Sequence, residues 1–246
     1  MMEQRLGATR RAVFMEGVHD GVPIALGYFV VAFTLGILAK TAGLSAWQGF
    51  VTSAVNIASA GEYAGFTVIA AQAPYLEIAV LTLVANARYF LMAAALTQRF
   101  APETSLLHRL AVSFGVTDEI FGITVARGGA LNPYYNYGAM AISVPAWAAG
   151  TSAGILAGGI LPSAVVSALS VALYGMFVWV VLPAAKKSRP IGGMVLASCV
   201  LSLAATYAPV TSELSGGTRT ILLTLLIAGV GAALFPIDTE KEDDHA

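Results

Sequence analysis

Residues 53–73, SAVNIASAGEYAGFTVIAAQA, have the hydropathy of a membrane span but carry a carboxylate, Glu62, near the middle. An apolar run needs roughly 17–25 residues to cross a hydrocarbon core of about 30 Å. Ionisable side chains inside such runs are rare and costly, and they usually face the protein interior or a water-filled cavity. The stretch therefore predicts a polytopic membrane protein with a polar feature inside its helix bundle.

The composition of the whole chain agrees with this class. Of the 246 residues, 57% are hydrophobic and 11% are charged, and the mean hydropathy is +0.77. The net charge of −1 comes without any basic stripe, which excludes nucleic acid as a partner. The single cysteine, Cys199, excludes a disulfide framework and a cysteine metal cluster, so we expect no metal and no cofactor.

Apolar runs divide the chain into an all-α membrane bundle of about seven segments. Residues 1–21 are expected to form an uncleaved cytoplasmic or interfacial segment, residues 22–236 a single transmembrane transport domain, and residues 237–246 a disordered polar tail. The predicted spans are Val22–Ala39, Trp47–Ala73, Glu77–Leu96, Tyr137–Gly159, Pro162–Leu182, Ile191–Ala208 and Thr220–Pro236.

The basic residues indicate that one segment does not cross the membrane in the ordinary way. Seven plain spans would place the N-terminal arginines and the cluster KKSR (186–189) on opposite sides, although both are typical of cytoplasmic loops. Either VTDEIFG (116–122) also crosses, or the segment Trp47–Ala73 turns back on itself. Gly61 and Gly65 weaken the helix around Glu62, so we expect an unwound segment there. Residues 111–129 are too short and too charged for a span, which favours a re-entrant or broken helix.

A short internal echo has two interpretations. The letters GILA occur at 36–39 and again at 154–157, each near the end of a predicted span. A duplication with three crossings per unit would give the inverted repeat of secondary transporters. Coincidence among small apolar residues is the alternative.

Two charges are predicted to lie at similar depth. Glu62 lies about 12–13 residues before the turn at residues 74–75, and Arg88 lies about 13 after it, so at 1.5 Å per residue they would meet on adjacent helices. One hypothesis is a structural ion pair between them. A second is the polar lining of a substrate or ion path, with the members Asn56, Gly61, Glu62, Tyr63, Asn86 and Arg88. The third is that Glu62 and Arg88 make no contact.

Thr117, Asp118 and Glu119 form a second polar group. A threonine followed by two acids is typical of a helix N-terminus, where carboxylates complement the helix dipole. The same residues would also serve as a titratable pair in a water-accessible cavity. No constellation for covalent catalysis stands out, since His19, His108 and His245 all lie outside the predicted spans, and we expect no enzyme.

Three segments resemble the AzlC family of branched-chain amino acid exporters: FMEGVHDGVPIALGYFVVAFTLGILA (14–39), VANARYFLMAAAL (84–96) and GVTDEIFG (115–122). The resemblance implies the large subunit of a two-component exporter, with a small AzlD-type membrane protein as its partner. It also implies efflux of valine, leucine, isoleucine and related amino acids, coupled to protons, across the bacterial inner membrane. On matching positions it marks Glu16, Asp20, Pro23, Arg88, Thr117, Asp118 and Glu119.

The chain departs from the family pattern at its central carboxylate. Many relatives look like AGASQF where this chain has SAGEYA, so Glu62 stands in place of an expected glutamine. This change adds a titratable group beside the presumed path and leaves open a different transported solute. A transporter of the same fold for another small solute, a membrane-embedded enzyme and a non-transporting assembly subunit are the alternative functions.

Overall fold

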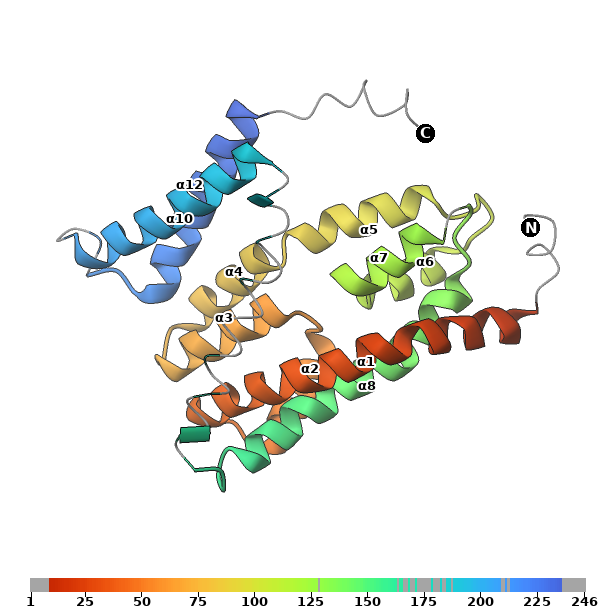
Figure 1. Cartoon of the computed structure of the whole chain (residues 1–246), viewed down its shortest axis with the longest axis horizontal. Coiled ribbons are helices and arrows are strands. Elements are labelled where there is room, and N and C mark those ends of the chain that lie inside the picture. The colour runs from red at the N-terminus through yellow and green to blue at the C-terminus, as the bar shows by residue number, and fades with distance from the viewer. Residues whose placement is uncertain are drawn as a thin grey trace. The chain divides into compact units, whose positions relative to one another are not determined.

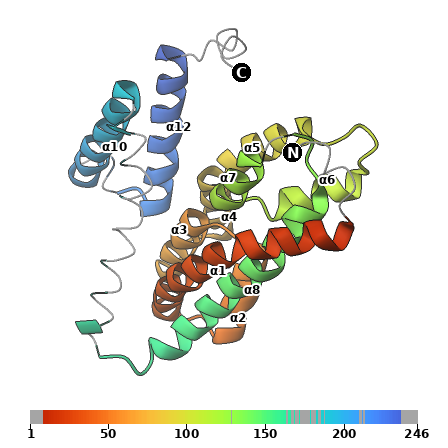
Figure 2. The same cartoon turned by 45° about the vertical axis from the view of Figure 1, so that its right-hand side comes forward.

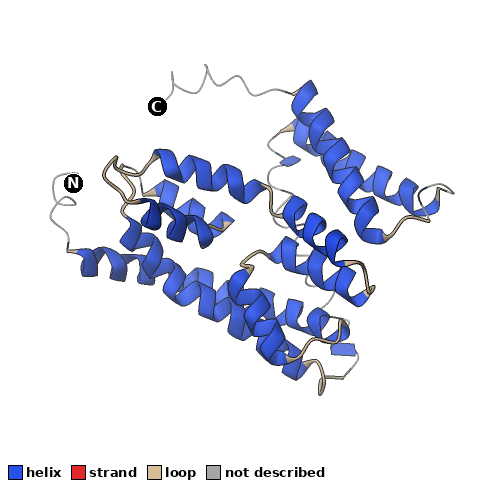
Figure 3. Cartoon of the chain, turned by 180° about the vertical axis from the view of Figure 1, so that it is seen from behind, coloured by secondary structure: helices blue, strands red, loops and turns tan. Residues whose placement is uncertain are grey.

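The computed structural model describes residues 9–127, 129–162, isolated positions between 164 and 186, 188–208, 211 and 213–235. Helices dominate these residues, as the all-α prediction requires (Figure 3). They form two compact units, unit 1 with Met1–Gln72 and Ala85–Leu173, and unit 2 with Ala73–Val84 and Tyr174–Ala246. The helices are α1 (Arg10–Thr41), α2 (Ala46–Val55), α3 (Ser59–Ala70), α4 (Tyr75–Ala85), α5 (Arg88–Gln98), α6 (Leu106–Phe114), α7 (Asp118–Ala126), α8 (Pro133–Ala157), α10 (Arg189–Tyr207) and α12 (Gly216–Leu234).

Among the described residues, four helices are long and apolar enough to cross a membrane, or five if a bent pair is counted as one span. The helices α1, α8, α10 and α12 are each long and apolar enough, and α4 and α5 qualify only together, as a bent pair. The predicted segment Trp47–Ala73 is broken into the two short helices α2 and α3, which confirms the alternative that this segment turns back on itself. The predicted span Pro162–Leu182 lies mostly outside the described residues, and the tail 237–246 lies entirely outside them.

The centre of unit 1 is a pair of long helices, α1 and α8, which lie side by side in two views (Figure 1, Figure 2). Gly17 packs on the backbone of Tyr135, and Gly36 packs on the backbone of Thr151 and Gly154, so the helices run in the same direction. Any Cβ at Gly17 or Gly36 would collide with backbone atoms of the other helix. Glycine allows this approach because small residues bring helix backbones into direct contact.

The two GILA segments lie at the contact between α1 and α8, and they do not indicate an inverted repeat. Gly36 and Gly154, which open the two GILA segments, face each other across the helix crossing. Equivalent helices of an inverted repeat would run in opposite directions, whereas α1 and α8 are parallel. The echo therefore reflects the shared need for small residues where two helices touch.

The helices α2 and α3 form a re-entrant hairpin. A capping box between Ser45 and Gln48 starts α2, and residues 56–58 interrupt the helix. Ser53 Oγ lies 2.8 Å from Glu62 Oε2 although the residues are nine apart, a separation that spans about 13 Å in a continuous helix. The chain therefore turns back. Ser152 Oγ donates to the Ala46 carbonyl at 2.7 Å, so the hairpin enters beside the C-terminal end of α8.

The helices α6 and α7 form a second hairpin, as predicted for residues 111–129. His108 on α6 lies 2.8 Å from the Tyr137 hydroxyl, and Thr124 on α7 accepts from Asn136 Nδ2 at 2.9 Å. Both partners belong to the N-terminal part of α8, whereas Thr117, at the turn, reaches deeper, to Tyr28 of α1. This hairpin therefore enters from the end opposite to the α2–α3 hairpin.

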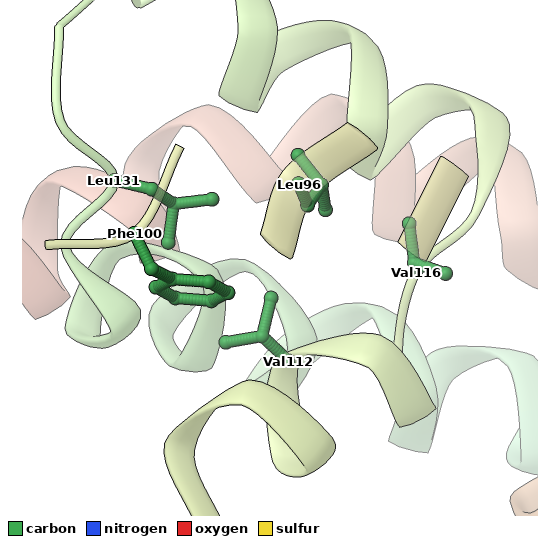
Figure 4. Close-up of a cluster of buried hydrophobic side chains, with 5 residues drawn as sticks. All are labelled: Leu96, Phe100, Val112, Val116 and Leu131. Carbon is green, nitrogen blue, oxygen red and sulfur yellow. The ribbon is translucent and has the colours of Figure 1, made fainter. Parts of the chain in front are cut away.

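The α6–α7 hairpin is anchored to α5. A cluster of buried apolar side chains fills the space between these elements (Figure 4). Its members are Leu96, Phe100, Val112, Val116 and Leu131. Arg99 donates to the carbonyls of Val125 and Gly129, and Arg109 donates to those of Thr97, Ala101 and Thr104. These guanidinium groups add hydrogen bonds to backbone carbonyls at the ends of α5 and α7 and in the loops that follow them.

Unit 2 contains α4, α10 and α12. Glu77 of α4 accepts hydrogen bonds from the Ser215 hydroxyl and, at 3.0 Å, from Thr218 N, so it caps the N-terminus of α12 together with Ser215. A carboxylate at this place also complements the helix dipole. The described side chains of α10 and α12 are apolar and largely exposed, as a lipid-facing surface requires.

Gly36→Ala should destabilise the protein, because its Cβ would collide with the Thr151 carbonyl oxygen. Overpacking of this kind costs roughly 1–3 kcal/mol, and thermal unfolding in detergent should shift down accordingly. Gly27→Ala on the same helix is the matched control, since a Cβ there meets nothing within 4 Å. Equal melting temperatures for the two variants would contradict the parallel glycine-lined contact.

Candidate functional site

The turns of the two hairpins are joined by one aromatic pair, Tyr28 of α1 and Trp147 of α8. Their ring centroids lie 5.3 Å apart in an edge-on arrangement. Tyr28 bonds to residues at the start of α7, and Trp147 bonds to Glu62 near the start of α3. Both aromatic residues lie near the middle of helices that are long enough to cross a membrane, so the two hairpin turns meet deep inside unit 1.

Glu62 is completely buried, with 1% of its surface exposed. Its Oε1 accepts from Trp147 Nε1 at 2.6 Å and its Oε2 accepts from Ser53 Oγ at 2.8 Å. Ser53 Oγ also lies 2.7 Å from Thr151 Oγ1 on α8. The carboxyl group of Glu62 thus ties together α2, α3 and α8, and it does not face an open path.

The start of α7 surrounds the hydroxyl group of Tyr28. Thr117 caps α7 by accepting from Ile120 N at 3.3 Å, which confirms the predicted helix N-terminus. The Tyr28 hydroxyl lies 2.6 Å from Glu119 Oε2 and 2.5 Å from Thr117 Oγ1. Tyr28 has one hydroxyl hydrogen, and an ionised carboxylate can only accept. Tyr28 therefore donates to Glu119 and accepts from Thr117.

Arg88 pairs with Asp118 and not with Glu62. Arg88 Nη2 lies 2.9 Å from Asp118 Oδ2, and the guanidinium carbon lies 5.2 Å from the Tyr89 ring centroid. Both charged side chains are about two-fifths exposed. The first hypothesis for Glu62, a structural ion pair with Arg88, is therefore wrong. Arg88 instead connects the start of α5 to the start of α7.

Asn56 and Asn86 meet beside the first turn of α3. Asn86 Nδ2 donates to Asn56 Oδ1 at 3.0 Å, and the Asn86 carboxamide packs directly on Gly61. Gly61 and Gly65 lie inside α3, so the predicted unwinding at these glycines is wrong, and the break falls earlier, at residues 56–58. No side chain caps α3, whose N-cap residue is Ala58. The first backbone N–H groups of α3 are thus available to an anion.

The other predicted site residues lie elsewhere. Asp20 accepts from the Tyr135 hydroxyl at 2.8 Å, and Glu16 pairs with Arg127, both near the N-terminal end of α8. Pro23 is an exposed residue inside α1. Tyr63 follows Glu62 on α3 and is half-buried. The predicted residues therefore fall into two sets. Glu16 and Asp20 form hydrogen-bonded or ionic pairs near the N-terminal end of α8. The central group lies at the two hairpin turns and contains Asn56, Gly61, Glu62, Asn86, Arg88, Thr117, Asp118 and Glu119.

Four residues of the central group escaped sequence analysis: Tyr28, Ser53, Trp147 and Thr151. Each lies in an apolar run where aromatic and hydroxyl side chains are commonplace in packed helices. A buried tyrosine or tryptophan usually finds a polar partner, which is the one signal that could have marked them.

The central group contains more carboxyl groups than cations. Glu62, Asp118 and Glu119 face a single described cation, Arg88, which is paired with Asp118. Such an arrangement favours an ammonium group or a proton as its ligand. Among the described residues, no group of three or more His, Cys, Asp or Glu side chains is placed to hold a metal ion.

Comparisons with known proteins agree with a membrane protein. An uncharacterized membrane protein of Archaeoglobus fulgidus is 31% identical over 180 residues, which are 71% of this chain and 77% of that protein. The inner membrane protein YgaZ of Escherichia coli is 32% identical over 117 residues, and the match spans 47% of each chain. No solved structure matches.

The family comparison matches the helices that build the site. Residues 23–161 match the family model described as AzlC protein, a range that runs from α1 through α8 and so contains both hairpins. The match covers more than half of the chain. The protein therefore belongs to the AzlC family.

Proposed function

We propose that this chain is the large subunit of a secondary transporter that exports branched-chain and related hydrophobic amino acids across the cytoplasmic membrane, driven by the proton gradient. The observation that carries the proposal is the meeting of two re-entrant hairpins, which enter from opposite ends of the α1–α8 pair and turn near Tyr28 and Trp147. Broken helices that end at mid-membrane are the usual binding elements of secondary transporters.

The chemistry of the two turns suits an amino acid zwitterion. The free N–H groups at the start of α3 and the Asn86 amide would receive the substrate carboxylate. Asp118 and Glu119, at the start of α7, would receive the ammonium group. Ile57 and Val116, which are buried at the two turns, give an apolar environment for a branched side chain.

Basic residues at one end of unit 1 support an orientation. Arg127 pairs with Glu16 near the start of α1, Arg10 lies 5.3 Å from the Tyr134 ring, and Arg99 binds the chain just before α8. Lys40 belongs to the other end of α1. By the positive-inside rule, the end where α1 and α8 begin faces the cytoplasm. The α6–α7 hairpin would then open to the cytoplasm and the α2–α3 hairpin to the outside.

Glu62 favours a second candidate, a transporter of the same fold for another small solute. A carboxyl group replaces the glutamine expected from the family resemblance, and it is buried beside the α3 N-terminus. Efflux from proteoliposomes, measured with a panel of amino acids and other small solutes, distinguishes the two candidates.

Proteoliposomes that hold this chain with its small AzlD-type partner should release valine, leucine and isoleucine, and the chain alone should do so poorly. Arg88→Gln or Asp118→Asn should reduce flux roughly tenfold or more, since each 1.4 kcal/mol of lost interaction is a factor of ten. The double variant should be no worse than either single one. Glu103→Gln, in the loop after α5, is the control. Full flux from the chain alone would contradict the two-component proposal.

Labelling with a membrane-impermeant maleimide should establish the orientation. In a Cys199→Ser background, Thr41→Cys at the C-terminal end of α1 should react in intact cells. Glu103→Cys should react only after the cells are opened, because the basic end of unit 1 lies inside. The reverse pattern would invert the proposed topology.

A further inference from the structure

We propose that Glu62 is a proton-binding site of this chain, at which Ser53, Thr151 and Trp147 hold the carboxyl group in either protonation state. The proposal rests on the proposed function only where it links this proton to transport. Its geometry is the four-residue group of hydrogen bonds that joins the α2–α3 hairpin to α8.

The surroundings of Glu62 contain no cation in the described part of the chain. Ser53 of α2 and Trp147 and Thr151 of α8 are neutral, and Tyr28 of α1 directs its hydroxyl to Glu119 on α7. The guanidinium group of Arg88, at the start of α5, pairs with Asp118. An unpaired carboxylate in a closed apolar site is costly, and a bound proton removes that cost.

The hydroxyl groups allow both states without an unsatisfied atom. With Glu62 ionised, Trp147 and Ser53 donate to its two oxygens, and Thr151 donates to Ser53. With Glu62 protonated, its O–H donates to Ser53, Ser53 donates to Thr151, and Thr151 donates to the Trp147 carbonyl, 3.5 Å away. Only hydroxyl rotations separate the two patterns, since each hydroxyl group both donates and accepts.

The position of these hydrogen bonds couples proton binding at Glu62 to movement of the α2–α3 hairpin. Ser53 precedes the break at residues 56–58, and Glu62 follows it, so both must leave α8 if the hairpin moves. Such a movement would expose Glu62 to water, where the ionised form is well solvated. Proton release at an open hairpin and proton binding at a closed one follow from these two environments.

Tryptophan fluorescence tests the site independently of transport. Trp47→Phe and Trp179→Phe leave Trp147 as the single reporter, whose indole N–H binds Glu62. In nanodiscs, the Trp147 emission should change through a single transition as the pH rises. The infrared band of the protonated Glu62 carboxyl group should disappear over the same pH range. Glu62→Gln should abolish both signals while keeping the fold, because its amide can reproduce the hydrogen bonds of the protonated acid. Glu103→Gln should retain them.

Ser53→Ala provides a second variant, which removes the hydroxyl group between Glu62 and Thr151 and keeps the carboxyl group of Glu62. It should shift the midpoint of the fluorescence transition and leave the infrared band present. A pH-independent Trp147 signal in the parent protein, or a transition that persists in Glu62→Gln, would overturn the proposal.

Flux experiments separate this proposal from the proposed function. In proteoliposomes with the small partner, Glu62→Gln should keep substrate exchange. The stimulation of flux by a pH gradient should fall at least tenfold. Unchanged stimulation would disprove the coupling role of Glu62. A pH transition at Glu62 in a protein that moves no amino acid would leave the proton site standing and refute amino acid export.

Discussion

The direct backbone contact between α1 and α8 is the constraint on which unit 1 depends. Glycine at Gly17, Gly36 and Gly154 lets the two parallel helices touch, and this contact sets Tyr28 beside Trp147. A wider spacing would separate these rings and break the only described aromatic link between the hairpin turns. The glycines therefore influence the site without touching it, because the helix contact they allow sets the positions of Tyr28 and Trp147, to which the two turns bind.

The base and the turn of the α6–α7 hairpin are held by several kinds of interaction. The α6–α7 hairpin is fixed to α5 by an apolar cluster that extends to Val116 at the turn, and its base is fixed by arginines that bind backbone carbonyls. Its turn is held by hydrogen bonds of Thr117 and Glu119 to Tyr28 and by the half-exposed pair of Arg88 and Asp118. Exposed ion pairs contribute little to stability, and hydrogen bonds can be exchanged for water. Of these contacts, the partly exposed pair of Arg88 and Asp118 is thus the one that can be exchanged for water at the lowest cost.

Hydropathy could predict the helical class, and the acids after Thr117 could predict a re-entrant helix start, because both depend on local sequence. The break before α3 could not be placed, since Gly61 serves the packing of Asn86 and not an unwound backbone. The partner of Arg88 could not be predicted, because counting from the turn at residues 74–75 brings Glu62 to its depth, whereas the sequence gives no distance to Asp118. Tyr28 and Trp147 escaped detection because their partners lie on distant elements, Glu119 and Glu62.

The glutamine that the family resemblance leads us to expect in place of Glu62 would have a direct chemical meaning in this geometry. A glutamine oxygen would accept from Trp147, and its NH₂ group would donate to Ser53, which would then donate to Thr151. That pattern is the one that a protonated Glu62 makes, so a glutamine holds the site permanently in its neutral arrangement. A chain with the amide at this position would keep the hydrogen bonds between α3 and α8 without the ability to change charge. In this chain the same tie can lose a proton, and the strength of the contact between hairpin and helix then depends on the protonation state of one buried group.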